Sequence, residues 1–257
     1  MTLQYASDLH LEFSTNAQYL LEHPIEPTGE VLLLAGDITS LNYYDKRTHQ
    51  KAFFEQLAKQ FERVFWIAGN HELYRSWDAA AFGKPIQEAI LPNVFLCNNV
   101  ALTHGGVRFV LTTLWSHISD VEGVYIQLNM SDFELIRYQG RPLTTGLYTN
   151  RLHRLALDFL ADTFAQPFDG PTVVATHHLP SLQCVHRRHR GSALNPAFAT
   201  DLDQEILRWQ PRCWIYGHSH ANMPDVQIGD TTLLTNQLGY VSYNEMAGYR
   251  TDAVVTV

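Results

Sequence analysis

Residues 64–72 have the sequence VFWIAGNHE, in which an uninterrupted apolar run ends at a glycine and three polar side chains follow. Residues 31–37 have the same design, VLLLAGD. Short apolar runs bounded by a turn residue are typical of strands that are buried on both faces of a sheet. Each stretch therefore predicts a buried strand that ends in a loop carrying polar groups.

Strand-like and helix-like stretches alternate along the N-terminal half, which predicts a parallel or mixed sheet covered by helices. We expect strands at 3–7, 31–35, 64–68, 94–96, 107–112, 173–175, 213–216, 231–234 and 253–255, and helices at 46–63, 79–90 and 151–164. The long segment 115–148 mixes glycine and proline with aromatic residues. An irregular segment of this length is often a functional lid or a binding loop. Because no repeat, low-complexity tract or linker is visible, we expect residues 1–257 to form one domain.

Composition narrows the class of protein. Hydrophobic residues make up 46% of the 257-residue chain, which is ample for a core, and the formal net charge is -8. A broad negative field disfavours a sequence-independent binder of nucleic-acid polymers. The three cysteines are scattered, as expected for reduced thiols and not for a disulfide framework. No secretory leader or membrane-length apolar run is visible, so we expect a cytoplasmic protein that does not enter a membrane.

Five short motifs rich in metal-ligand atoms each follow an apolar, strand-like run. They are Asp8-Leu9-His10, Gly36-Asp37, Gly69-Asn70-His71-Glu72, His177-His178 and Gly217-His218-Ser219-His220. Ligands in open α/β sheets collect at the carboxyl ends of strands, where the loops converge. One such motif alone is usually an ordinary turn. Together they supply the oxygen and nitrogen ligands that a pair of divalent ions requires, which indicates a metal-dependent hydrolase.

The order and spacing of these motifs resemble the calcineurin-like metallophosphoesterase superfamily, whose pattern is Asp-x-His, Gly-Asp, Gly-Asn-His-Glu/Asp, His and Gly-His-x-His. The resemblance spans residues 8–220. Features typical of the small bacterial branch occur at 115–116, 176–181, 190–192 and 239–240. The resemblance implies an α/β fold with four layers, α-β-β-α, in which helices flank two mixed sheets and the metals lie at the strand ends.

The resemblance also implies a role for each motif residue. One metal would be held by Asp8, His10 and His220, and the other by Asn70, His177 and His218. Asp37 would bridge both ions, and His71 would be the general acid that protonates the leaving group. We choose His177 over His178 because it directly follows the expected strand.

The implied reaction is in-line attack on a phosphate by a hydroxide that the two ions share. A ligand set of nitrogen and oxygen without thiolate suits manganese, iron or zinc, and we favour manganese. The substrate would be a small phosphomonoester or phosphodiester, and the motifs do not choose between them. Asp37 is followed by Ile38-Thr39-Ser40 and not by the Asp-Arg-Gly of protein Ser/Thr phosphatases, so that activity is disfavoured.

Several nearby residues receive less specific expectations. Arg190, within the basic run 186–190, and His178 are candidates for substrate contact, although a solvated basic loop explains the run equally well. Glu72 either orients His71 or a ligand histidine, or caps the following helix. Trp115 and Tyr74 either line the pocket or belong to the core.

Two rival functions remain. A non-catalytic scaffold could keep this fold for partner binding, but such proteins typically lose a metal ligand or the acid histidine, and here every position is present. A metal-dependent hydrolase of non-phosphate esters is disfavoured only by the resemblance.

Overall fold

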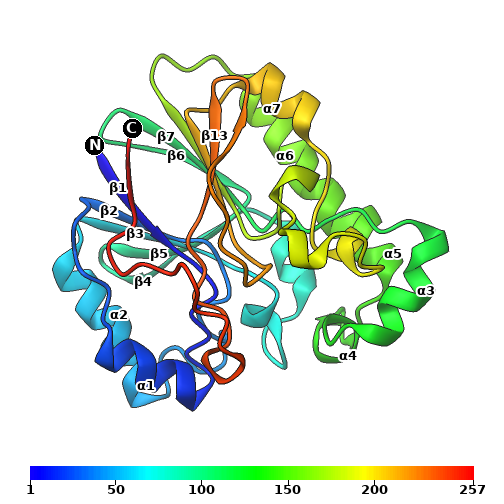
Figure 1. The fold of residues 1–257 in the computed structure, drawn as a ribbon, viewed down its shortest axis with the longest axis horizontal. Helices are drawn as coiled ribbons and strands as arrows, with labels where there is room; N and C mark the ends of the chain where they lie inside the picture. The colour runs from blue at the N-terminus through cyan, green and yellow to red at the C-terminus, as the bar shows by residue number, and fades with distance from the viewer.

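Two six-stranded sheets lie face to face in the computed structural model, which describes residues 1–257 (Figure 1). The first sheet has the order β14 (Val254–Thr256), β1 (Thr2–Ala6), β2 (Val31–Leu34), β3 (Arg63–Ile67), β5 (Val94–Asn98), β4 (Ile86–Leu91). The second has the order β12 (Val226–Ile228), β13 (Thr231–Thr235), β11 (Cys213–Tyr216), β10 (Thr172–Thr176), β7 (Val107–Thr112), β6 (Val100–His104). In each sheet the four inner strands are mutually parallel, and an antiparallel strand closes both edges.

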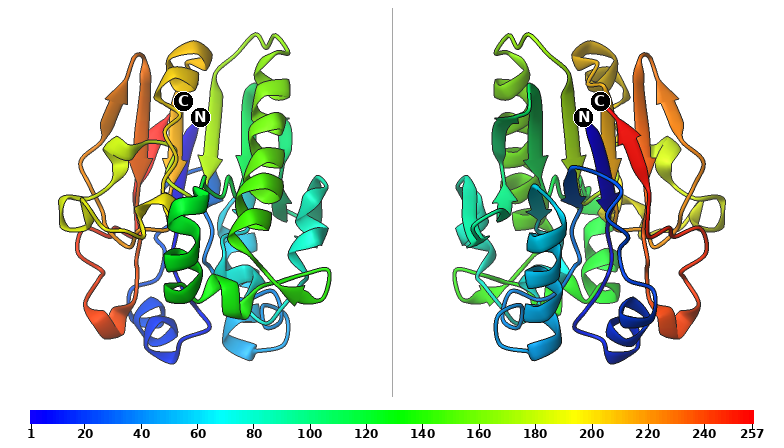
Figure 2. Two further views of the ribbon diagram at one scale, coloured as in Figure 1. Left: turned by 90° about the vertical axis from the view of Figure 1, so that its right-hand side faces the viewer. Right: turned by 90° about the vertical axis from the view of Figure 1, so that its left-hand side faces the viewer.

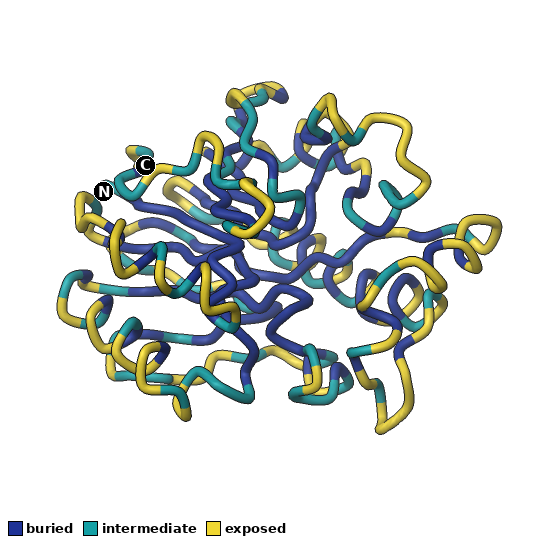
Figure 3. The backbone as a smooth tube through the Cα atoms, turned by 60° about the horizontal axis from the view of Figure 1, so that its bottom comes forward, coloured by how far each residue is buried: buried dark blue, intermediate teal, exposed yellow.

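Alternation along the strands places one set of side chains between the sheets and the other set under the helices. In β2, Val31 and Leu33 belong to the inter-sheet core, whereas Leu32 and Leu34 belong to the core beneath the helices. This is the two-residue period of a strand, applied to a run that is apolar on both faces. Figure 3 shows the strands as the buried centre of the molecule. The four-layer sandwich is therefore confirmed.

Helices cover the outer face of each sheet (Figure 2). The first sheet is covered by α1 (Ser14–Glu22) and α2 (Thr48–Gln60), which bury Leu20, Phe54 and Leu57 against it. The second is covered by α6 (Arg154–Phe164), which follows a π-helical turn at Tyr148–His153, and by α7 (Asp203–Trp209). Short 3₁₀ turns occur at His71–Leu73, Ala79–Gly83, Leu182–Cys184, Arg187–His189, Asn195–Ala197 and Val241–Tyr243.

The helix expected at 79–90 is wrong. A 3₁₀ turn occupies Ala79–Gly83, and the rest is β4, which pairs antiparallel with β5. Pro85 has no backbone N–H and cannot continue a helix. The strand β5 also leaves an open sheet edge, and pairing at that edge outweighs the local helical pattern.

The segment 115–148 is more regular than the sequence indicated. It contains α3 (Asp120–Asn129), α4 (Asp132–Leu135), α5 (Thr145–Leu147) and a hairpin of β8 (Arg137–Tyr138) with β9 (Arg141–Pro142). No helix in the protein combines the length and the apolar character needed to cross a bilayer.

Candidate metal centre

Five loops meet at one rim of the sandwich, each directly after a parallel strand. Asp8 and His10 follow β1, Asp37 follows β2, and Asn70 follows β3 in the first sheet. From the second sheet, His177 follows β10, and the loop after β11 carries His218 and His220. Parallel strands place their carboxyl ends at the same edge, so two sheets packed with this edge in common bring all five loops together.

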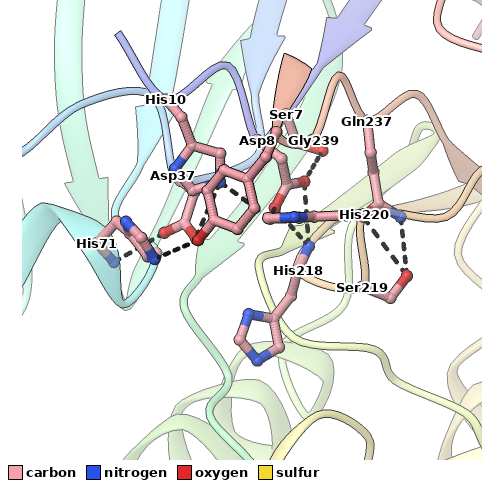
Figure 4. Close-up of polar contacts among 12 residues, drawn as sticks. Ser7, Asp8, His10, Asp37, His71, His218, Ser219, His220, Gln237 and Gly239 are labelled. Atoms are coloured by element: carbon pink, nitrogen blue, oxygen red, sulfur yellow. Dashed lines mark hydrogen bonds and ion pairs between the residues drawn. The ribbon is translucent and has the colours of Figure 1, made fainter. Parts of the chain in front are cut away.

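One group of ligand atoms is formed by Asp8, His10, Asp37 and His220, and these atoms lie within 4.8 Å of one another. His10 Nε2 and His220 Nε2 face each other at 2.9 Å. The carboxylate of Asp8 lies 3.4 Å from His220 Nε2. Figure 4 shows these side chains turned toward a common point.

A second group is formed by Asp37, His177 and His218, again with ligand atoms within 4.8 Å. His177 Nε2 lies 3.1 Å from His218 Nδ1 and 3.0 Å from Asn70 Oδ1. His177 Nδ1 is 2.9 Å from the carbonyl oxygen of Ala35, which can only accept, so Nδ1 carries a proton and Nε2 is the nitrogen that faces the group.

Asp37 belongs to both groups, and its two oxygens divide between them. Oδ2 lies 3.8 Å from His10 Nε2, whereas Oδ1 lies 3.4 Å from His177 Nε2. A carboxylate held in this way can reach two ions at once. The separation of its oxygens is the geometric basis for a bridging ligand.

The buried carboxylates of the site require nearby positive charge. Asp8 and Asp37 are 0% and 1% exposed, and buried carboxylates are strongly unfavourable unless positive charge accompanies them. Burial alone would lower the pKa of His177, but the Asp37 charge outweighs it and raises the pKa to about 9. Burial and the neighbouring His178 and His177 lower the pKa of His218 well below its ordinary value, which keeps that imidazole neutral and able to bind metal.

The ligand residues adopt an uncommon backbone conformation. Asp8, His10, Asp37, His218 and His220 all have φ between 48° and 75°. Such left-handed conformations store strain and concentrate at functional sites. Gly36 precedes Asp37 with φ of 90°, and a Cβ there would lie 2.3 Å from His177 Nδ1. Only glycine allows the two loops to approach this closely.

Hydrogen bonds from neighbouring groups hold the side chains of the first group in place. Ser7 Oγ donates to Asp8 Oδ2 at 2.6 Å, and the backbone N–H of His218 donates to the same carboxylate. Glu245 accepts from His220 Nδ1 at 2.7 Å, which directs the other ring nitrogen toward the group. Burial alone would lower the pKa of His220, but hydrogen bonds to Asp8 and Glu245 raise it to about 10.

The orientation of Asn70 is set by the segment 115–148. Its amide Nδ2 donates to Asp132 Oδ1 at 2.9 Å, which turns Oδ1 toward His177. Tyr74 donates its hydroxyl to the same oxygen of Asp132 at 2.5 Å. Asp132 therefore selects the amide orientation in which oxygen, and not nitrogen, is presented to a metal.

Glu72 supports the loops instead of contacting His71 or capping a helix. Its carboxylate accepts from the backbone N–H groups of Asp37, Ile38 and Gly69 at 2.9, 2.7 and 2.6 Å, and from Trp66 Nε1. Burial and the nearby Asp37 charge raise the pKa of Glu72 to about 7. The four hydrogen-bond donors act in the opposite direction, because they favour the ionised carboxylate. The side chain ties the loops after β2 and β3 together.

His71 lies beside the ligand groups without joining either of those that contain Asp37 (Figure 4). Its backbone N–H donates to Asp37 Oδ1 at 2.8 Å, and its Nε2 lies 3.1 Å from the hydroxyl of Tyr240. Its Nδ1 contacts Glu12 at 2.9 Å. Burial alone would lower the pKa of His71, but Asp37 and Glu12 hold it above the ordinary value.

Glu12 joins His71 to the candidate ligand His10. The same oxygen, Oε1, accepts from Nδ1 of His71 and from Nδ1 of His10, at 2.9 and 3.1 Å. Burial alone would raise the pKa of Glu12, but these two histidines lower it to about 2. Both rings therefore direct Nε2 into the site.

We expect Glu12→Gln to lower turnover by roughly 10- to 100-fold, the usual effect of losing a carboxylate partner behind a functional histidine. The amide keeps the shape but removes the charge that holds two Nδ1–H groups. The loss should fall on kcat more than on KM, because Glu12 orients two histidines whose Nε2 atoms face the centre of the site. Glu22→Gln, an exposed change in α1, is the matched control. Full activity of the Glu12 variant would contradict the role.

A cavity of about 310 Å³ opens over the ligand groups. Its walls include His71, Tyr74, Tyr240 and, from the segment 115–148, residues 129–132. Both Arg188 and Arg190 are exposed, but only Arg188 belongs to the lining. Arg188 also donates to the carbonyl oxygen of His220 at 2.6 Å. Of the basic run, the structure thus brings Arg188 to the site.

Two other residues lie behind the cavity. His178 is fully buried and contacts the hydroxyl of Tyr148 at 2.7 Å, so it supports the ring of His218 and does not reach the cavity. Trp115 is 2% exposed and belongs to the core. Glu12, Asp132 and Glu245 were missed by the sequence reasoning. Glu12 alone had a signal, because it continues the alternation of Asp8 and His10.

Most of the chain, including all five motifs, matches a known protein family. The sequence profile described as "Calcineurin-like phosphoesterase" matches residues 1–222, which include every motif. The chain belongs to the calcineurin-like phosphoesterase family. It is accordingly a phosphoesterase, a hydrolase, and members of this family depend on two metal ions.

Individual relatives cover most of the chain. Uncharacterized protein L509 of Acanthamoeba polyphaga mimivirus is 29% identical over 263 residues, which cover 93% of this chain and 91% of the relative. The fold is shared with the phosphopantetheinyl hydrolase PptH of Mycobacterium tuberculosis, with a TM-score of 0.68 and 18% identity over 99% of this chain and 95% of that one. A dimetal phosphatase from Danio rerio has a TM-score of 0.49, with 14% identity over 92% of this chain and 87% of that one.

The donor set of this family member fits a pair of divalent ions. Two pairs of imidazole nitrogens face each other, in His10 and His220 at 2.9 Å and in His177 and His218 at 3.1 Å. Each pair has room for only one proton between its two nitrogens. The carboxylates beside them require positive charge, and oxygen with imidazole nitrogen suits manganese, iron and zinc alike.

Proposed function

We propose that this phosphoesterase is a dinuclear metallohydrolase of a small phosphate ester, with His71 as the general acid. Asp8, His10 and His220 would hold one ion and Asn70, His177 and His218 the other, with Asp37 between them. The observation that carries the proposal is the division of the two Asp37 oxygens between the two ligand groups. We further propose that manganese is the native metal, that residues 1–257 act as one domain, and that the protein is cytoplasmic.

Two bound divalent ions would supply an acidified water as nucleophile and would compensate the charge on the phosphate oxygens during in-line attack. The chain itself supplies the proton and the alignment. His71 donates from Nε2 to the departing oxygen, and Glu12 holds the opposite ring nitrogen, so the ring cannot turn away. Arg188 and the cavity walls position the ester, since Arg188 is the arginine that lines the cavity.

The deciding experiment removes the metal with a chelator, restores manganese, iron or zinc separately, and compares an aryl phosphomonoester with the matched diester. We expect no turnover in the stripped protein and recovery with manganese at about two ions per chain. The faster ester then defines the substrate class. Two bound ions with no turnover of either ester would contradict the proposal and favour the non-catalytic scaffold.

A further inference from the structure

A second cavity adjoins the metal cavity. It has a volume of about 210 Å³ and lies beneath the loop that follows β10. Four residues line both cavities, namely His189, Leu194, Phe198 and Ser219. The two hollows therefore share a wall that includes Ser219, the residue between His218 and His220. The side cavity is thus the hollow next to the phosphate position that the proposed function assigns.

The walls of this side cavity are mostly apolar. Leu179 and Val185 are 1% and 6% exposed and are supported by the core beneath α6 and α7. Leu194 and Phe198 complete the apolar lining. The ring of Phe198 stacks on His218 with centroids 4.4 Å apart, so one wall is anchored to the metal-ligand loop. Pockets of this kind bind the apolar part of a small ligand.

The lining of the side cavity offers no partner for a positively charged substituent. No aspartate or glutamate lines it, and of the basic run 186–190 only the two histidines, His186 and His189, do. The metal cavity differs in this respect, because Asp37, Asp132 and Glu245 all line it. A cationic substituent such as choline or ethanolamine would find no carboxylate partner in this cavity. An uncharged substituent meets apolar surface instead.

We propose that the side cavity binds an uncharged, apolar ester substituent, and that the substrates of this enzyme are phosphate esters carrying a compact aromatic or short alkyl group. The inference rests on the proposed function, which places the phosphate at the ligand groups. The volume suits such a group, since an apolar cavity of about 150 Å³ is known to hold benzene.

The test measures binding, by calorimetry, of a series of phosphonates to the manganese-loaded protein. Methyl-, propyl-, pentyl- and phenylphosphonate share the same anionic head and cannot be hydrolysed at the P–C bond. We expect affinity to rise roughly two- to fourfold for each added methylene until the cavity is filled. Phenylphosphonate should bind at least about tenfold more tightly than methylphosphonate, and 2-aminoethylphosphonate no more tightly than methylphosphonate.

Two variants locate the effect. Val185→Phe and Ser192→Trp should fill the side cavity and remove the gain from longer substituents while methylphosphonate still binds. Ser192 is exposed, so its variant remains informative if Val185→Phe does not fold. Leu182→Trp, on the same loop but outside the lining, is the control.

The possible results distinguish failure of the side-cavity proposal from failure of the proposed function. Equal affinity along the series, or a gain that survives both filling variants, would overturn the side-cavity proposal and leave the proposed function standing. Failure of methylphosphonate to bind a protein that holds two ions would contradict the phosphate site itself, and both proposals would fall.

Discussion

Asp37→Asn should reduce turnover by roughly 10³-fold or more, because one carboxylate lies between both ligand groups and the charge stabilisation supplied by catalytic metal ions contributes several kcal/mol. The amide has nearly the same shape, and its oxygen can still accept from the backbone N–H of His71. The lost property is the negative charge that two ions would share. Metal content, measured by elemental analysis after dialysis, should fall from about two ions per chain to one or none.

The thermal stability of the same variant provides a second test of metal binding. A ligand that binds only the folded state at 100 times its Kd raises the free energy of unfolding by about 2.7 kcal/mol. Added manganese should therefore raise the Tm of the parent protein clearly and that of Asp37→Asn much less. Asp158→Asn, an exposed change in α6, is the matched control and should respond like the parent. An Asp37 variant that retains two ions and full turnover would disprove the bridging role.

His71→Ala should lower turnover of alkyl phosphate esters by about 10²- to 10⁴-fold, the usual contribution of a general acid. Metal content should not change, since His71 lies beside the ligand groups that contain Asp37 and is not part of them. Nitrophenyl esters should lose much less, because nitrophenolate departs without a proton. The ratio of alkyl to nitrophenyl activity is therefore the decisive measurement.

The control for this variant is His117→Ala, which removes an exposed histidine outside the motifs. It should leave both activities unchanged. If His71→Ala reduced both esters equally, His71 would act on the phosphate or the ions and not on the leaving group. Loss of bound metal would assign it to the coordination sphere instead.

Much of the fold could be predicted from local pattern. The apolar runs at 31–35 and 64–68 form β2 and β3, and the helix expected at 46–63 is α2. These elements are buried against neighbours on one or both faces, so their hydrophobic pattern carries most of the information. The error at 79–90 has the opposite cause. There β4 lies at an edge of the sheet and is largely exposed, so its hydrophobic pattern is weak. Pairing with β5, and not the local sequence, makes this stretch a strand.

The supporting residues of the site could not be predicted in the same way. Asp132 and Glu245 lie in segments without hydrophobic periodicity, far along the chain from Asn70 and His220. Arg188 and Arg190 are equivalent in sequence, but the short turn at Arg187–His189 places only Arg188 against the cavity. Nothing local distinguishes such residues, because their function lies in a contact with a distant loop.

The sequence by itself determined the buried parallel strands and the set of candidate metal ligands, because these depend on short runs and on chemistry that every residue carries alone, and the family resemblance of its motifs indicated the two-sheet class. Only the tertiary structure decided how Asp37 divides its oxygens, which carboxylate stands behind each histidine, and that an apolar cavity adjoins the site. Those features depend on distances of a few ångströms between loops of different strands. Such distances follow from how the two sheets pack, and no local stretch of sequence encodes that packing.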